Sequence, residues 1–420
     1  MEKSKDKTPT AQMQQQFLGR PGSFLEELAR EGARRMLAQA MEVEVAQFVE
    51  KHQAKLDDEG RRQVVRNGYM PARDLVTGIG ALTVRQPRLD DRVLKERGEE
   101  RFTSRILPRY LRRVPSVDNL IPILYLKGIS TGDMSEALTS ILGPDAAGLS
   151  ATNVVRLKAQ WEQDYQEWSQ RDLKGKRYVY MWADGIHVNV RLDEEKSCIL
   201  AIMGADAEGN KELLAVSDRY RESKDSWGEM LLDLKRRGMT EAPKLAIGDG
   251  ALGFWAALRE VFPGCREQRC WFHKSGNVLD KMPKSVQGKA KSMLHQMWQA
   301  PTKEKAMAAY EHFIASWGEK YPKAVECLQK DVEELFTFYD FPAAHWVHIR
   351  TTNPIESTYA TVRLRTKKTK GCGSRTATLT MVFKLAQEAQ KTWRRLRRHE
   401  QILLVMAGKK FIDGELEAVA

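Results

Sequence analysis

A change of periodicity at Arg177 constrains the fold of this 420-residue chain more than any other feature. Before Arg177 the apolar residues recur at helical spacing, whereas after it short apolar runs and alternating patterns typical of β-strands appear. A strand pattern grouped in this way, with helices between the later strands, predicts a mixed α/β domain. The expected strands lie at 177–192, 198–205, 212–216, 244–247 and 266–272, with helices at 223–237 and 251–261 preceding the fourth and the fifth.

The segment before this domain is expected to be mainly helical. Residues 24–48 form an amphipathic pattern suited to packing or dimerisation, Asn67-Gly68 predicts a turn, and Leu75–Val84 predicts a hairpin. Helices interrupted at Gly128 and Gly143 then predict a helix-turn-helix near 117–162, although an ordinary helical bundle has the same pattern. The polar residues of its last helix are the candidate DNA contacts: Thr152, Asn153, Arg156 and Lys158.

Asp184 ends the apolar run 177–184, which an alternating run then continues to 192, and Asp249 follows the strand at 244–247; a glycine comes directly after each acid. Asp184 and Asp249 therefore lie where open α/β sheets place their functional groups, although either Asp-Gly dipeptide alone also fits a common turn. Two carboxylates that are brought together repel each other, and a divalent cation relieves that repulsion. Oxygen ligands prefer hard ions, so the pair predicts a site for Mg²⁺ or Mn²⁺.

Glu356 is the third candidate acid, and it has two readings. Asn353 as N-cap, Pro354 at the first helical position and Glu356 three residues after the cap form a capping box, which alone would be structural. Arg363 and Lys367 follow Glu356 by seven and eleven residues and so share its helix face, where they could hold a phosphate backbone beside a metal. Between Arg363 and Arg398, twelve Lys or Arg accompany one acid, which favours DNA contact and adds Arg365 to the candidates.

Cys270 and His273 could suggest zinc, but four ligands are needed and no second Cys/His pair lies at a suitable spacing. We therefore expect a structural cysteine and a hydrogen-bonding histidine near the site. The five cysteines of the chain are few and scattered, as in proteins of a reducing compartment.

The overall charge favours a polyanionic partner. The formal net charge is +12, and no apolar stretch reaches the roughly 20 residues of a membrane span. The polar N-terminus has no apolar signal region, so we expect a soluble, intracellular protein with no membrane partner.

Taken together, these residues resemble the bacterial insertion-sequence transposases of the Mutator-like superfamily, from about residue 24 to residue 398. Residues 89–102 depart from the basic, glycine-containing stretch of that family. The motifs that carry the resemblance are Asn67-Gly68-Tyr69 with Pro87-Arg88, Tyr125–Ser130, Tyr180–Gly185, Gly248–Trp255, Gln268–Lys274 and Arg350–Thr358.

The resemblance implies a ribonuclease-H-like core with an Asp, Asp, Glu triad at Asp184, Asp249 and Glu356, and an all-helical insertion before the glutamate. It also makes Cys270 and His273 a family feature and implies N-terminal recognition of terminal inverted repeats. The expected organisation is a tail at 1–20, a DNA-binding region at 21–172, the core at 173–274, the insertion at 275–345, and the Glu356 helix with basic helices at 346–420.

The function expected on this basis is metal-dependent DNA cleavage followed by transfer of the released 3′-OH, with two divalent ions held by the triad. The expected partners are the terminal repeats and target DNA, bound by a dimer or a larger assembly. The expected location is the bacterial cytoplasm, in association with the nucleoid. A catalytically silent DNA-binding regulator and a ribonuclease-H-like nuclease stay open as alternatives. A tyrosine recombinase is disfavoured because no tyrosine follows Tyr359, and a serine recombinase leaves the three carboxylates unexplained.

Overall fold

The computed structural model describes residues 21–99, 101–129, 133–142, 151–188, 197–250, 252–368 and 374–417. The chain divides into two compact units, residues 1–155 and 156–420, each of which has its own architecture. No helix in the described part of the chain is both long and apolar enough to cross a membrane.

The first unit contains the predicted amphipathic helix and the predicted hairpin. Helix α2 (Pro21–Lys51) buries Met41 against the hairpin of β2 (Arg73–Thr77) and β3 (Gly80–Val84). The turn predicted at Asn67-Gly68 is wrong. This dipeptide lies inside β1 (Val65–Tyr69), where the pairing with β4 (Pro87–Asp90) shifts register, and Gly68 supplies the positive φ of 65° at that bulge.

Three helices follow, as the sequence predicts. Helix α4 (Pro115–Leu126) stops before Gly128, whose φ of 110° is unfavourable for other residues, and α5 (Met134–Leu142) and α6 (Ala151–Ser169) come next. Gly143 and the side chains of Thr152 and Asn153 lie outside the described residues, so the helix-turn-helix stays a prediction. The short helix α3 (Arg92–Glu96) precedes this group.

All five predicted strands form one mixed sheet in the second unit, in the order β7-β6-β5-β8-β9. The first three along the chain pair antiparallel, and β8 and β9 then add in parallel to β5. The strands are β5 (Tyr178–Val188), β6 (Ser197–Asp206), β7 (Lys211–Arg219), β8 (Leu245–Gly248) and β9 (Arg266–Arg269).

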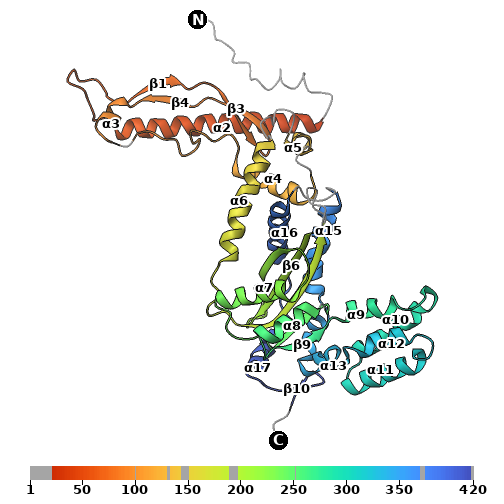
Figure 1. Ribbon diagram of the computed structural model, residues 1–420. Helices are drawn as coiled ribbons and strands as arrows, with labels where there is room; N and C mark the ends of the chain where they lie inside the picture. Colours follow the sequence, from red (N-terminus) through yellow and green to blue (C-terminus); the bar gives the residue numbers. More distant parts are fainter. Residues whose placement is uncertain are drawn as a thin grey trace. The chain divides into compact units, whose positions relative to one another are not determined.

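Helices cover both faces of this sheet (Figure 1). Helices α7 (Lys224–Arg236) and α8 (Leu252–Val261) bury Trp227 and Phe254 against Met181 of β5, which forms the main core. Residues alternate between faces along a strand, so Trp182 and Asp184 point to the opposite face. There α15 (Asn353–Lys368) and α16 (Arg375–Gln390) contact β5 and β7.

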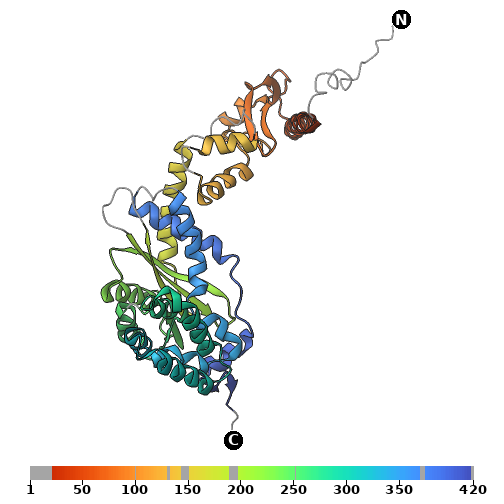
Figure 2. The same ribbon diagram turned by 90° about the vertical axis from the view of Figure 1, so that its right-hand side faces the viewer.

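The helical block begins earlier than expected, because β9 ends at Arg269 and α9 starts at Trp271. Helices α9 to α12 pack on one another beside the sheet (Figures 1 and 2). The elements of the block and of the segment up to α15 are α9 (Trp271–Leu279), α10 (Lys284–Gln299), α11 (Lys303–Trp317), α12 (Pro322–Gln329), α13 (Val332–Leu335), η1 (Thr337–Asp340), η2 (Ala343–His345) and α14 (Trp346–Ile349); after α16 come η3 (His399–Gln401), α17 (Ile402–Met406), β10 (Phe411–Ile412) and β11 (Glu415–Leu416).

Candidate active site

Asp184 lies inside β5 and not at its end, which corrects the sequence prediction. The strand continues to Val188 because residues up to Val188 stay paired with β6. The parallel neighbour β8 pairs only with Tyr180–Trp182, so Asp184 lies just past the point where that neighbour stops. The side chain of Asp184 is 5% exposed. Asp184 is therefore a buried acid on a central strand, just beyond the last residue of that strand that pairs with β8.

Asp249 directly follows β8, as predicted. Gly250 then turns the chain with a φ of 91°, and a Cβ atom there would collide with the guanidinium of Arg269. Arg269 is itself buried and is fixed by an ion pair to Asp331, with Nε 3.1 Å from Oδ2. The glycine therefore allows a close approach that holds the turn carrying Asp249.

A short series of hydrogen bonds joins this turn to the segments that carry the other candidates. The Cys270 amide donates to the Gly248 carbonyl at 2.8 Å, and the Trp271 amide donates to the Arg350 carbonyl at 3.0 Å. The Thr352 amide then donates to the Cys270 sulfur at 3.3 Å. Three segments far apart along the chain are thereby fixed side by side.

Glu356 lies in the first turn of α15, four residues after Thr352. The helix begins at Asn353, so Asn353 is its first helical residue, and the capping box predicted on Asn353 is wrong by one position. The hydroxyl of Thr352 donates to Glu356 Oε1 at 2.7 Å, and the Glu356 amide donates to the Thr352 carbonyl at 3.0 Å. Because threonine and asparagine are both good N-caps, the local sequence did not distinguish the two starts.

His273 lies beside this glutamate. Its Nε2 is 3.2 Å from Glu356 Oε1, and its Nδ1 is 3.4 Å from the Thr352 hydroxyl. One ligand atom each of Cys270, His273 and Glu356 lie within 4.8 Å of one another. We call these three residues the helix-start trio.

The three candidate acids are close enough to influence one another. Burial raises the pKa of Asp184 to about 7, and the charges of Asp249 and Glu356 add to the rise while His273 opposes it. Burial lowers the pKa of His273, but the contact with Cys270 and the charges of Glu356 and Asp184 outweigh it and raise this pKa to about 9. The site is thus negatively charged, partly compensated by an imidazolium.

Such a set of donors fits a divalent cation. The groups are carboxylate oxygens, which hard ions such as Mg²⁺ and Mn²⁺ prefer. Asp184 is a buried acid that tends to keep its proton among neighbouring negative charges, and a divalent ion would replace that proton.

The sequence did not point to Glu222. This residue follows β7 and precedes Ser223, the N-cap of α7, and its carboxylate occupies the space that a Cβ atom on Gly185 would need. Burial raises the pKa of Glu222 to about 7, with a further contribution from the charge of Asp249. An acid at a strand–helix junction was the available signal, but its distance along the chain from Asp184 and Asp249 concealed it.

The predicted DNA-contact residues differ in their exposure to solvent. Arg156 and Arg363 are exposed, and Lys158 is half-buried. Arg365 is only 4% exposed, so a surface contact with DNA at this position is wrong. The reason is helical periodicity: Arg365 follows Glu356 by nine residues, which places it on the opposite side of α15. The side chain of Lys367 lies outside the described residues.

Comparison with known proteins gives a consistent result. The chain is 52% identical over 300 residues to the transposase for insertion sequence element IS6120 of Mycolicibacterium smegmatis, covering 71% of this chain and 92% of that relative. It is 50% identical over 288 residues to the transposase for insertion sequence element IST2 of Acidithiobacillus ferrooxidans, covering 67% and 95% respectively.

A solved structure of the Drosophila P element transposase strand transfer complex aligns with 75% of this chain and 88% of that chain, at 11% identity. Its TM-score of 0.27 is too low for any argument about the fold. The family model described as "Transposase, Mutator family" matches residues 3–396. The chain therefore belongs to the Mutator family of transposases.

Proposed function

We propose that this transposase cuts DNA at the ends of its element and joins the released 3′-OH to target DNA, using Asp184, Asp249 and Glu356 as the ligands of two divalent ions. The observation that supports this most is the raised pKa of Asp184, to which burial and the charges of Asp249 and Glu356 contribute. Asp184 is buried and Asp249 and Glu356 are half-buried, so acids from three distant segments of the chain influence one another away from full solvent, as is typical of functional sites.

We infer further that the second unit is a ribonuclease-H-like core of the DDE type. Three antiparallel strands followed by two parallel ones, with the candidate acids on the neighbouring strands β5 and β8, support this fold. The helices between β9 and α15 would then be the insertion that the family resemblance implies.

The side chains would divide the work. Mg²⁺ or Mn²⁺, when bound, would polarise a phosphodiester and make an attacking water or hydroxyl more acidic. Asp184, Asp249 and Glu356 would hold the ions, while Thr352 and His273 orient the Glu356 carboxylate through the contacts described above. Arg363, exposed seven residues beyond Glu356, would contact the DNA backbone.

The proposed partner is double-stranded DNA, both terminal inverted repeats and target. The net charge of +12 supports a polyanionic partner, and helix α6, which carries Arg156 and Lys158, would recognise the ends. Two ends have to be handled together, so we infer a homodimer or a larger assembly on DNA.

Asp249→Ala provides a direct test, because Asp249 lies between β8 and α8, whereas Glu356 lies in the first turn of α15, where a substitution also affects the start of the helix. We expect the variant to bind DNA carrying the element's terminal repeat but to lose strand cleavage in Mg²⁺. Asp225→Asn, at an exposed position in the first turn of α7, is the matched control and should cleave normally. Cleavage retained in Asp249→Ala would contradict the assignment, wild-type nicking without joining would indicate a nuclease, and wild-type binding without nicking a regulator.

A further inference from the structure

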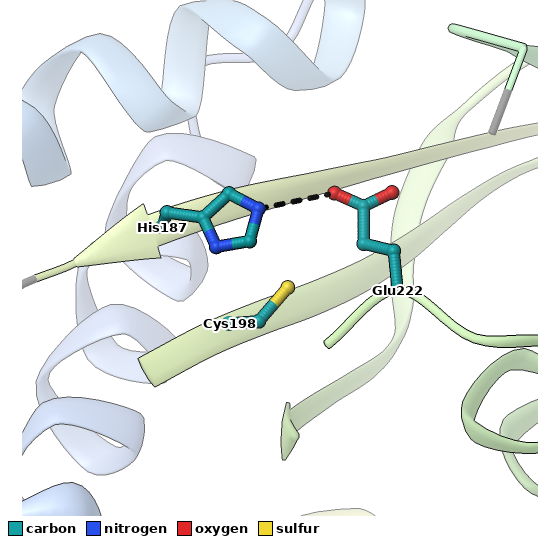
Figure 3. A group of neighbouring side chains, drawn as sticks. All are labelled: His187, Cys198 and Glu222. Atoms are coloured by element: carbon teal, nitrogen blue, oxygen red, sulfur yellow. Dashed lines mark ion pairs between the residues drawn. The ribbon is translucent and has the colours of Figure 1, made fainter. Parts of the chain in front are cut away.

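A second group of histidine, cysteine and glutamate lies on the other face of the sheet. His187 of β5 and Cys198 of β6 are direct cross-strand partners, so their side chains share one face. Glu222 reaches them from the segment between β7 and α7, and the three side chains point toward one another (Figure 3). We call these residues the sheet trio.

The spacing of the sheet trio is close to that of a metal site. His187 Nε2 lies 3.8 Å from Glu222 Oε1, and one ligand atom of each residue lies within 4.8 Å of the other two. Ligand atoms around a tetrahedral zinc ion, at roughly 2.0–2.3 Å from the metal, are about 3.3–3.8 Å from one another. Small side-chain rotations would therefore be enough to close the group on an ion.

The group lacks internal hydrogen bonds that would explain it otherwise. Within the part of the chain that the structure describes, no hydrogen bond reaches the Glu222 carboxylate or the Cys198 thiol, and 3.8 Å is too long for one from His187. Cys198 is fully buried and Glu222 is partly buried. Both groups have therefore lost hydrogen bonds to water, and no hydrogen bond within the described structure replaces them. Burial, with the charge of Glu222, raises the pKa of the Cys198 thiol to about 12, which a bound cation would reverse.

We propose that His187, Cys198 and Glu222 bind one transition-metal ion of the zinc class, with water at the fourth position. A nitrogen, a sulfur and an oxygen donor suit a borderline ion such as Zn²⁺ and not Mg²⁺, which prefers oxygen alone. The His187 side chain is 54% exposed, so an ion can enter from that side. The bound ion would tie the β5–β6 pair to the segment before α7 and fix Glu222 above Gly185.

Cobalt substitution of the full-length protein tests this site without any DNA. Chelator-treated protein titrated with Co²⁺ should develop a thiolate-to-cobalt charge-transfer band with tetrahedral d–d bands, at one equivalent. Cys198→Ser should lose the charge-transfer band, whereas Cys265→Ser should retain it, because Cys265 lies outside both trios. Cys270→Ser should also retain it, which separates this site from the helix-start trio.

His187→Gln covers the possibility that a change at buried Cys198 prevents folding. His187 is largely exposed, so this variant should fold, as circular dichroism would check, and should bind Co²⁺ and Zn²⁺ at least about tenfold more weakly. The absence of a thiolate band in the wild type would overturn the proposal. Unchanged affinity in His187→Gln, loss of the band in Cys270→Ser, or displacement of Co²⁺ by millimolar Mg²⁺ would each overturn it as well.

Discussion

The helix-start trio and the sheet trio contain the same three residue types but are built differently. In the first, the Thr352 hydroxyl contacts Cys270, His273 and Glu356 at 3.3, 3.4 and 2.7 Å. In the second, His187 Nε2 lies 3.8 Å from Glu222 Oε1, and no hydrogen bond from a described residue joins the three side chains. The first is organised in advance around its own hydrogen bonds, whereas the second leaves its donors available to an ion.

The two trios also differ in their neighbours. The helix-start trio adjoins Asp184, whose pKa is raised by burial and by Asp249 and Glu356, so its surroundings favour hard divalent ions. The sheet trio combines buried sulfur with an exposed imidazole and favours a softer ion. Similar residue composition therefore predicts different metals once geometry and neighbouring charges are considered.

The largest expected effect is on DNA cleavage, which should depend on the helix-start trio and not on the sheet trio. Glu356→Gln should reduce Mg²⁺-dependent cleavage of end DNA by about a thousandfold or more, because a metal ligand that contributes several kcal/mol is lost. The same variant should keep the cobalt–thiolate band of the sheet trio.

Glu229→Gln is the matched control for this change. Glu229 is an exposed glutamate of α7, paired with Arg219, and its replacement should leave both readouts unchanged. If Glu356→Gln kept its cleavage but lost the cobalt band, the roles assigned to the two trios would be reversed.

A second effect concerns stability without metal. The folded-state pKa of Asp184, about 7, lies above the usual value of 3.8 for an unfolded aspartate. The free energy of unfolding of the metal-free protein therefore falls as pH rises from the unfolded-state pKa to the folded-state pKa, because the unfolded state loses its proton first. Asp184→Asn should therefore be more stable than the wild type at pH 8 by a few kcal/mol, and the difference should shrink toward pH 5. Urea unfolding in the presence of a chelator measures this, and a less stable variant at pH 8 would contradict the crowding of charges at the site.

The smallest expected effect concerns the Thr352 hydroxyl, which contacts all three residues of the helix-start trio and which we call the bridge. Thr352→Val removes the hydroxyl that donates to Glu356 and should lower cleavage about tenfold, as expected for loss of one orienting hydrogen bond to a metal ligand. Thr352→Ser keeps the hydroxyl and should stay near the wild-type rate. Since Thr352 precedes α15, melting curves should accompany the assay, and equal rates in both variants would show that the bridge has no positioning role.

The sequence predicted the parts of this molecule that depend on local patterns. Periodicity was enough for five strands, for the hairpin at β2 and β3, and for the position of Asp249 directly after its strand. The place of Asp184 could not be predicted in the same way, because it depends on where β8 ends beside β5. Glu222 was missed for a similar reason, since only the folded sheet brings it over Gly185.

The error at Arg365 is of another kind, because the sequence contained the information needed to avoid it. A spacing of nine residues from Glu356 already places Arg365 on the opposite face of the helix. The number of basic residues in a stretch does not tell which of them lie on the exposed face of the helix. The bulge at Gly68 shows the same limit for turns, since Asn-Gly suits a hairpin turn and also a positive-φ position inside a strand.

The most direct test of the account is a crystal structure of the protein with end DNA and Mn²⁺, with the metal located by its anomalous scattering. We expect manganese peaks in contact with the carboxylates of Asp184, Asp249 and Glu356, next to the phosphate to be cut, and none at the sheet trio. Manganese bound away from these three carboxylates, or any one of the three turned away from a metal that the other two hold, would contradict the proposed active site.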